Sequence, residues 1–328
     1  MSDIGHIFDL YSGEIKRVED KLIEIFQSDV LLIQAIGRHI VKSGGKRMRP
    51  LFLMLSAGMA GYDPAERGDD HIKFASIIES IHTASLLHDD VVDEAEARRG
   101  EPSANALWSN QVVVLAGDFM YSNALKLTIG HRDHRINEAL SAATTRMTQG
   151  ELKQLERSHS VEITEDEYFD IISAKTGALI SAACQIGGIL SGCPQEQERA
   201  LADYGMKVGN AFQVADDILD YSADDEAFGK ELGKDLDEGK VTLPLIYLLR
   251  HTSGSERKEI SALLDNGVTE PGLKRMMELF KKYKALEETR ERALSLIEEA
   301  KKDLTVFPGC TERDHLFEIA DYTLSRRK

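Results

Sequence analysis

Two aspartate clusters have the residue type and spacing best suited to chemistry in this sequence. The clusters are Asp89-Asp90-x-x-Asp93 and Asp216-Asp217-x-x-Asp220. Carboxylates at i, i+1 and i+4 crowd one turn of a helix, where they repel one another and lower helix stability. They also supply the hard oxygen ligands that Mg²⁺ prefers, alongside water and phosphate oxygens. Each cluster is therefore a candidate magnesium site.

A solvated acidic helix face is the alternative interpretation of a single cluster. Both clusters, however, have apolar neighbours, among them Leu86 and Leu87 in the first and Ile218 and Leu219 in the second. Such flanks are not typical of a fully wet surface. If the two helices face each other, six aspartates line one cavity. Neither cluster has the D-x-D-x-D-G spacing of an EF-hand calcium loop.

Basic residues accompany the two clusters along the chain. They are Lys46 and Arg49 after a glycine pair, Arg98 and Arg99 after the first cluster, Lys175 before an uncharged segment, and Lys230, Lys234 and Lys240 after the second cluster. Arg and Lys bind phosphate oxygens through charge-assisted hydrogen bonds. Any one of these groups alone is more typical of surface charge. Together with the aspartates, they indicate a diphosphate site in which Mg²⁺ bridges acid and anion.

The elements that must position these residues are predicted to be helices. Thr164-x-x-Glu167 is a capping box, and Pro271 suits the first turn of a new helix. The run Val112–Leu115 is the clearest β-branched segment, but it lies inside a longer helical pattern. No linker is long or biased enough to separate two domains. We therefore expect one all-α domain over residues 1–328, with a helix from about Thr311 to the basic end.

Composition excludes some classes of function. The 328 residues carry a formal net charge of -16, which argues against general binding to nucleic acid or to anionic membranes. The uncharged segment 176–195 contains several glycines and Pro194, so it predicts a buried helix ending near Gly192 and not a membrane span. The three cysteines have no metal-ligand or disulfide spacing, which is typical of reduced thiols and indicates a cytoplasmic protein.

Six motifs occur in a fixed order between about Gly44 and Pro244. They are GGKRMRP, LLHDDVVDEAEARRG, GDFMYSNA, KTGAL, FQVADDILDY and GKDLDEGKVTLPLI. In these motifs the sequence resembles the trans-type isoprenyl diphosphate synthases (polyprenyl synthetases), and most of all the bacterial medium- and long-chain members. The resemblance implies antiparallel helices around a deep central cavity and a homodimer. It also implies Mg²⁺-dependent, head-to-tail condensation of isopentenyl diphosphate with an allylic diphosphate.

The same resemblance implies a role for each candidate residue. Three magnesium ions would be present with substrate bound, held by Asp89, Asp93, Asp216 and Asp220, with Asp90 and Asp217 as the remaining catalytic aspartates. Arg98, Lys175 and Lys234 would bind the allylic diphosphate. Lys46, Arg49, His82 and Arg99 would bind the isopentenyl diphosphate, and Lys230 and Lys240 are further substrate-binding candidates. Thr176 and Gln213 would stabilise positive charge beside the reacting carbons, so no side chain need act as a nucleophile.

Product length depends on the space beside the helix that carries Asp89. Ala84 and Ser85 lie five and four residues before it, where short-chain members of the family tend to place bulky aromatics. Small residues predict an open channel and a product longer than C20, similar to an octaprenyl chain, although ordinary helix packing explains them too. Candidates for the floor of the channel are Phe119, Met120, Leu125 and Leu127.

Three other functions fit part of this pattern. A class I terpene cyclase shares the first aspartate cluster and the ionisation step, but usually has an Asn/Asp–Ser/Thr–Glu motif in place of the second cluster. A non-catalytic subunit of a heteromeric synthase generally lacks one aspartate cluster, and both are intact here. A structural metal-binding protein does not account for the paired basic motifs.

Overall fold

The computed structural model describes residues 4–42, 44–95, 97–98, 101–221, 233–266 and 269–325. Helices dominate these ranges, as the sequence predicts. The first half contains α1 (Gly5–Leu10), α2 (Ser12–Ile25), α3 (Leu31–Lys42), α4 (Met48–Met59), α5 (Pro64–Arg67), α6 (Asp70–Val92), α7 (Ala104–Leu107), α8 (Asn110–Thr128) and α9 (His134–Arg157). The second half contains α10 (Glu165–Ile172), α11 (Ala178–Ser191), α12 (Gln195–Leu219), α13 (Lys234–Asp237), α14 (Leu243–His251), α15 (Gly254–Asn266), α16 (Glu270–Tyr283), α17 (Ala285–Asp303) and α18 (Thr311–Ser325).

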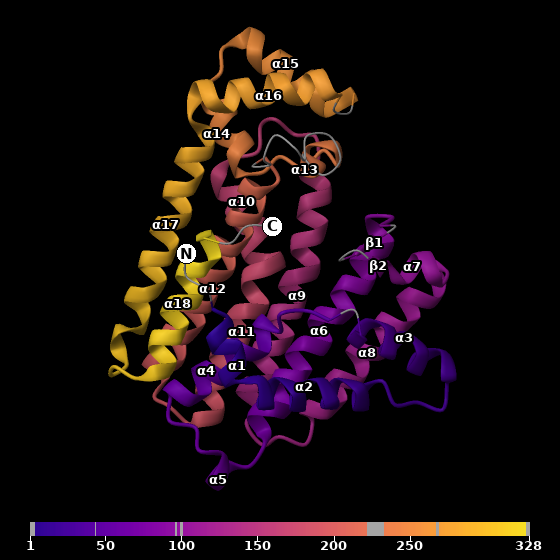
Figure 1. Cartoon of the computed structure of the whole chain (residues 1–328), viewed down its shortest axis with the longest axis vertical. Helices are drawn as coiled ribbons and strands as arrows, with labels where there is room; N and C mark the ends of the chain where they lie inside the picture. Colours follow the sequence, from indigo (N-terminus) through magenta and orange to yellow (C-terminus); the bar gives the residue numbers. More distant parts are fainter. Residues whose placement is uncertain are drawn as a thin grey trace.

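Long helices form a bundle in which α11 is central. It packs along α12, α4 and α9, while α6 packs against α8 and α4, and α17 covers the outer side of α12. Figure 1 shows α9, α12 and α17 running along the length of the molecule, with α15 and α16 lying across one end. Buried apolar side chains from α4, α6, α11 and α12 form the main core. Of these helices, α4, α6 and α12 carry candidate site residues, whereas α11 carries none.

Local sequence signals explain several helix boundaries. The Thr164 side chain caps α10 as part of a capping box with Glu167. Gly192 ends α11 in the left-handed conformation, with φ 70°, and Pro271 lies in the first turn of α16. The uncharged helix α11 is almost entirely buried within the bundle. No helix in the described part of the chain is long and apolar enough to cross a membrane.

Two local features differ from the sequence-based expectation. A short antiparallel pair of strands, β1 (Ala97–Arg98) and β2 (Glu101–Pro102), follows α6 in a domain that was expected to be all-α. The residues Ser173–Gly177 form a π-helical turn, η1, between α10 and α11. A π turn holds one more residue than an α turn and therefore rotates the side chains that follow it. Periodicity of apolar residues does not reveal such a turn, because one extra residue changes the pattern very little.

Candidate active site

Two adjoining cavities lie among these helices. The α6–α9 cavity has a volume of about 440 Å³ and is enclosed by α4, α6, α8, α9, η1 and α12. The α4–α12 cavity has a volume of about 850 Å³ and is enclosed by α4, α6, η1, α11, α12 and α18 together with the loop before α4. Five residues line both cavities and so form a shared wall: Arg49, His82, Leu86, Thr176 and Gln213.

The cavities bring together many of the residues singled out from the sequence. Asp89, Lys175, Ala84 and Ser85 line the α6–α9 cavity. Lys46 and Asp216 line the α4–α12 cavity. Four more of the candidates belong to the shared wall, namely Arg49, His82, Thr176 and Gln213. Each cavity is therefore lined by both an acidic and a basic residue, and the two cavities adjoin at the shared wall.

The two neighbouring aspartates of α12 face different surroundings, because successive helical residues are rotated by about 100°. Asp216 lines the α4–α12 cavity, whereas the side chain of Asp217 is buried beside α10. The Tyr168 hydroxyl donates to Oδ2 of Asp217 at 2.5 Å, and Nε2 of Gln213 donates to Oδ1 at 2.9 Å. Burial, reinforced by the charge of Asp235, raises the pKa of Asp217 to about 8 despite these two donors.

Gln213 and Thr176 are held together in the shared wall. The Thr176 hydroxyl donates to Oε1 of Gln213 at 3.0 Å, and Asp217 fixes the amide from its other side. The π turn that carries Thr176 also packs very closely on α12. A Cβ atom added at Gly209 would lie 2.7 Å from Cα of Gly177. Two glycines thus allow the backbone approach that places the hydroxyl beside the amide.

Lys175 also belongs to the π turn and is anchored on α9. Its ammonium lies 2.8 Å from a carboxylate oxygen of Glu151 and donates to Oε1 of Gln154. Its side chain remains a quarter exposed. These contacts hold the cation at the wall of the α6–α9 cavity, which Asp89 of α6 also lines.

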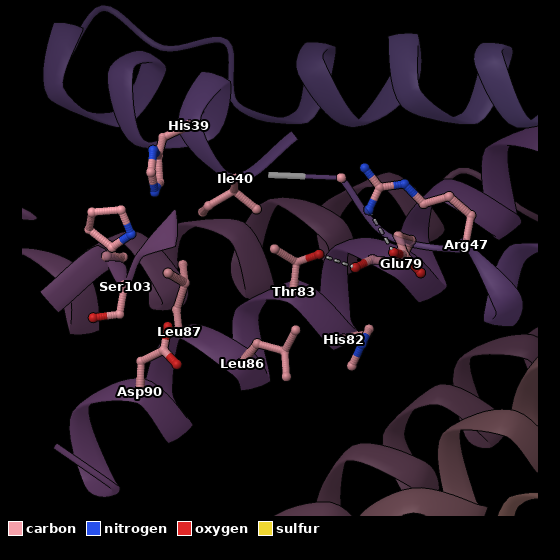
Figure 2. Close-up of a pocket in the computed structure, with 13 residues that line it drawn as sticks. His39, Ile40, Arg47, Glu79, His82, Thr83, Leu86, Leu87, Asp90 and Ser103 are labelled. Carbon is pink, nitrogen blue, oxygen red and sulfur yellow. Dashed lines mark hydrogen bonds and ion pairs between the residues drawn. The ribbon is translucent and has the colours of Figure 1, made fainter. Parts of the chain in front are cut away.

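The aspartates of the first cluster also point in different directions. Asp89 lines the α6–α9 cavity, but Asp90 is buried and lines a separate pocket of about 60 Å³. Figure 2 shows Asp90 in that pocket, on the side of Ser103 and away from Arg47. Asp93 is the exposed C-cap residue of α6. Of this cluster, Asp89 lines the α6–α9 cavity, and neither Asp90 nor Asp93 lines either of the two adjoining cavities.

Electrostatic contacts connect the first cluster with the segment that follows the second. Burial lowers the pKa of Lys240, but the hydrogen bond to Glu238 and the charges of Asp93 and Asp235 outweigh it, so the pKa is raised. Asp220, the C-cap residue of α12, accepts at Oδ2 from the backbone amide of Asp235 at 3.1 Å. Lys240 therefore lies within the field of acidic residues from both α6 and the α13 region.

A glycine of α8 positions the helix turn that carries Asp89. The ring of His88 lies over Gly117, where an added Cβ would be 2.5 Å from Nε2. The same nitrogen is 3.3 Å from the carbonyl oxygen of Val114 and 3.3 Å from a carboxylate oxygen of Asp118. This contact gives a structural reason for the Gly-Asp pair in the GDFMYSNA motif.

The loop before α4 presents its cations to the α4–α12 cavity. Gly44 and Gly45 have φ values of 68° and 153°, which favour glycine. The Lys46 ammonium donates to the Tyr322 hydroxyl of α18 at 2.8 Å and lies 5.1 Å from the centre of that ring. Tyr322 therefore fixes Lys46 at the edge of the cavity, a contact that links the two ends of the chain.

Several candidates cannot be placed. Arg99 and Lys230 lie outside the described residues, and for Arg98 in β1 and Lys234 in α13 only the backbone is described. Within the described residues, no three His, Cys, Asp or Glu side chains converge closely enough to hold a metal ion by themselves.

The expected floor of the α6–α9 cavity is different in the structure. None of Phe119, Met120, Leu125 and Leu127 lines it, and α8 contributes Tyr121 instead. Met120 is buried in a separate apolar cluster, and Leu127 lines another cavity beside α2. Because Tyr121 is four residues after Gly117, it lies on the face of α8 that Gly117 turns towards α6. Thr144, Met147 and Thr148 of α9 also line this cavity, and no sequence motif marks them.

Comparisons with known proteins agree with this geometry. Residues 30–280 match the polyprenyl synthetase family. The chain belongs to the polyprenyl synthetase family. This polyprenyl synthetase is 39% identical to octaprenyl diphosphate synthase from Escherichia coli over 324 residues, which is 99% of each chain. The resemblance seen in the sequence motifs is thereby confirmed, and the protein is a prenyltransferase.

Solved structures match this polyprenyl synthetase over its full length. A decaprenyl diphosphate synthase from Rhodobacter capsulatus is 35% identical, with a TM-score of 0.93, covering 99% of this chain and 100% of that one. A polyprenyl synthase from Caulobacter crescentus, complexed with calcium and isoprenyl diphosphate, is 36% identical, with a TM-score of 0.91 and coverage of 100% and 99%. The all-α fold predicted from the sequence is confirmed.

Proposed function

We propose that this polyprenyl synthetase condenses isopentenyl diphosphate with an allylic diphosphate, head to tail, to form a chain longer than C20. The observation that carries this assignment is the shared wall of the two cavities. On one side of it lie Asp89 and Lys175, and on the other lie Lys46 and Asp216. Two anionic substrates can bind on opposite sides of this wall with their reactive carbons at Thr176 and Gln213.

Each substrate is assigned by the lining of its cavity. The α6–α9 cavity continues from Asp89 and Lys175 past small and apolar residues of α6 and α9, so it suits an allylic diphosphate with a hydrocarbon tail. The α4–α12 cavity is bordered by Lys46, Arg49 and His82, so it suits the diphosphate of isopentenyl diphosphate. We propose Lys240, Lys234, Lys230, Arg98 and Arg99 as further diphosphate ligands from the adjoining segments.

The residues present fit Mg²⁺. All the candidate ligands, Asp89, Asp93, Asp216 and Asp220, offer carboxylate oxygens, which this ion prefers. They also lie at the C-terminal ends of α6 and α12, where the helix dipole disfavours negative charge. A divalent cation opposes both this effect and the repulsion between the aspartates. These four residues would hold the ions, whose chemistry is to stabilise the charge that develops on the leaving diphosphate.

The side chains of the shared wall account for the rest of the reaction. Lys175 holds the allylic diphosphate and stabilises the charge it gains as the allylic C–O bond breaks. The Thr176 hydroxyl donates to Gln213, so its lone pairs remain available to the cationic carbon beside it. Asp217 fixes the Gln213 amide in one orientation. The double bond of isopentenyl diphosphate attacks the carbocation, and the departed diphosphate accepts the proton then lost.

Products longer than C20 are proposed from the small residues along the tail cavity. Ala84 and Ser85 line the α6–α9 cavity without obstructing it, and Ser85 turns its hydroxyl back to the carbonyl of His82. The octaprenyl and decaprenyl synthases compared above support a long product. The facing wall of Tyr121 and Met147 then limits how far the tail extends.

We propose a cytoplasmic homodimer built from one domain per chain. Val114 and Leu115 of α8 are exposed apolar residues, at 37% and 61%, and Leu152 and Leu155 of α9 are each 58% exposed. Exposed apolar residues of this kind are suited to contact with another protein surface, although Leu152 and Leu155 also line the α6–α9 cavity. Sedimentation equilibrium of the purified chain should give twice the monomer mass, and Leu115→Glu should reduce that mass. A monomeric wild-type protein would contradict the dimer without touching the proposed chemistry.

The activity is tested by incubating the purified chain with Mg²⁺, isopentenyl diphosphate and allylic primers of increasing length. We expect diphosphate release that requires both substrates, and polyprenyl products longer than C20. Chelation of the metal should abolish turnover, and added Mg²⁺ should restore it. A terpene cyclase would instead release diphosphate from the allylic substrate alone. Absence of turnover with every primer would overturn the proposal and favour a non-catalytic subunit.

A further inference from the structure

Arg47 lies between two proposed diphosphate ligands, Lys46 and Arg49, yet its side chain is buried rather than presented to substrate. The whole residue is only 6% exposed. Its Nη1 donates to Glu79 of α6 at 3.0 Å and its Nε to Glu19 of α2 at 3.1 Å. Glu79 is itself 5% exposed. A buried arginine with two carboxylate partners has its charge satisfied within the protein.

The backbone of Arg47 is held in an unusual conformation. It has φ 46° and ψ 40°, in the left-handed region, and it is the N-cap of α4. Residues with a Cβ rarely adopt this region without compensation from their surroundings. The hydrogen bonds of the guanidinium supply that compensation. They include a contact of Nη2 with the Val41 carbonyl at 3.5 Å, which spans the loop from the end of α3.

Glu79, the partner of Arg47, lies one helical turn before His82, which lines both substrate cavities. Glu79 is three residues before His82, so the two lie about one turn apart on α6. Figure 2 shows Arg47 reaching to Glu79, with His82 on the following turn of the same helix. The ion pair therefore joins the loop that carries Lys46 and Arg49 to the turn that carries His82.

We propose that Arg47 and Glu79 together form a positioning pair for the isopentenyl diphosphate site. Their ion pair fixes the left-handed turn at Arg47, and that turn sets the distance between Lys46, Arg49 and His82. This inference rests on the proposed function, because it assigns the α4–α12 cavity to isopentenyl diphosphate. Arg47 acts through its neighbours and does not contact the substrate.

A direct role for Arg47 as a phosphate ligand is the alternative, because the residue also lines the α4–α12 cavity. Glu79→Gln separates the two. It keeps the arginine and its charge but removes the carboxylate that holds it. If Arg47 positions its neighbours, Glu79→Gln impairs binding much as Arg47→Gln does. If Arg47 binds phosphate directly, Glu79→Gln leaves binding unchanged or improves it.

The test measures steady-state kinetics for Arg47→Gln, Glu79→Gln and the double variant, with each substrate varied separately. We expect the KM for isopentenyl diphosphate to rise about 10-fold or more in all three variants. The KM for the allylic primer should change little. The double variant should be no worse than the worse single variant, because both substitutions break one shared contact.

Glu198→Gln is the matched control. Glu198 of α12 is 6% exposed and pairs with Arg135 of α9 at 2.7 Å, so it is another buried glutamate with an arginine partner, although this arginine is 46% exposed. It lies at the opposite end of α12 from Asp216, and its loss should lower stability without changing either KM. Equal rises in both KM values, or a normal KM in Glu79→Gln, would overturn the positioning role. An inactive wild-type enzyme would instead overturn the proposed function.

Discussion

Asp217 differs from its neighbour Asp216 because its side chain is buried and hydrogen-bonded to Tyr168 and Gln213, whereas Asp216 lines the α4–α12 cavity. The spacing of the DDxxD pattern gives no sign of this difference, since both positions carry the same side chain. Helical geometry separates them by about 100°, so one can bind an ion while the other orients an amide. Two aspartates of one motif, Asp216 and Asp217, can therefore have different roles.

The raised pKa of Asp217 predicts a pH-dependent stability. An aspartate in the unfolded chain has a pKa of about 3.9, whereas the pKa of Asp217 in the folded chain is raised to about 8. Between these values the folded protein binds a proton that the unfolded chain releases. The free energy of unfolding should therefore fall as pH rises from about 4 to about 8, by up to about 1.4 kcal/mol per pH unit from this group.

Asp217→Asn should remove this contribution. Urea unfolding of the metal-free protein at several pH values should show that the variant gains stability relative to wild type as pH rises. Asp29→Asn, which changes an exposed carboxylate, serves as the control. Parallel curves for wild type and Asp217→Asn would show that the carboxyl is already ionised in the folded protein at low pH.

Gly117→Ala tests the contact that supports the first aspartate cluster. Alanine in a helix is normally favoured over glycine by up to about 1 kcal/mol. Here the new methyl group would collide with the ring of His88, so we expect a net loss of about 1 kcal/mol instead, from overpacking. Gly13→Ala in α2 meets open space and should be neutral or stabilising. Denaturant unfolding of both variants measures the difference.

At the scale of single elements, the π turn η1 is the least predictable part of the site. Capping residues and apolar periodicity predict where α10 begins and where α11 ends, because those signals are local. The π turn depends on packing against α12 through Gly177 and Gly209, which are distant in sequence. The sequence therefore predicts that Lys175 and Thr176 are site residues, but it does not predict the π turn that orients their side chains.

Gly209→Ala should separate the π turn from α12. The added methyl group would lie 2.7 Å from Cα of Gly177, a backbone atom that cannot rotate away. We expect kcat to fall about 10-fold or more as Thr176 and Gln213 move apart, together with a loss of about 1–3 kcal/mol in stability. Kinetics and urea unfolding of the same preparation measure both effects.

Gly205→Ala is the matched control on the same helix. Its added methyl group would lie 2.8 Å from the carbonyl oxygen of Ile180, one turn further from the reacting pair. A similar loss of stability with a smaller loss of kcat supports the specific role of Gly209. Equal losses of kcat in the two variants would mean that general loosening of α11 and α12 explains the effect.

At the scale of the whole molecule, the sequence predicts the helical bundle and the assembly of acids and bases, because both follow from repeated, ordered motifs. It does not predict which face of α8 meets the cavity. The sequence does not mark Tyr121 as a lining residue, and the contact of Gly117 with His88 of α6 shows which face of α8 is turned inwards. The length of a cavity depends on how several helices pack together, so the sequence of one helix does not predict it.

Product length tests that assembly directly. Ala84→Phe should fill the α6–α9 cavity one turn before Asp89, so we expect shorter products at a comparable rate of primer consumption. Tyr121→Ala should enlarge the same cavity and lengthen the products. Chromatography of the dephosphorylated alcohols measures both distributions. Unchanged lengths in the two variants would show that the tail does not run between α6 and α8.

The wall shared by the two cavities has a consequence for repeated synthesis. Under the proposed assignment of the substrates, the new diphosphate belongs after each condensation to the unit that came from the α4–α12 cavity, while the next round needs it beside Asp89 in the α6–α9 cavity. The product must therefore translocate across Thr176 and Gln213 by one five-carbon step before another unit enters. Processivity is then the ratio of two rates, the rate of this translocation and the rate at which the product dissociates. Each methylene group of the tail that moves past Ala84 into the cavity favours translocation.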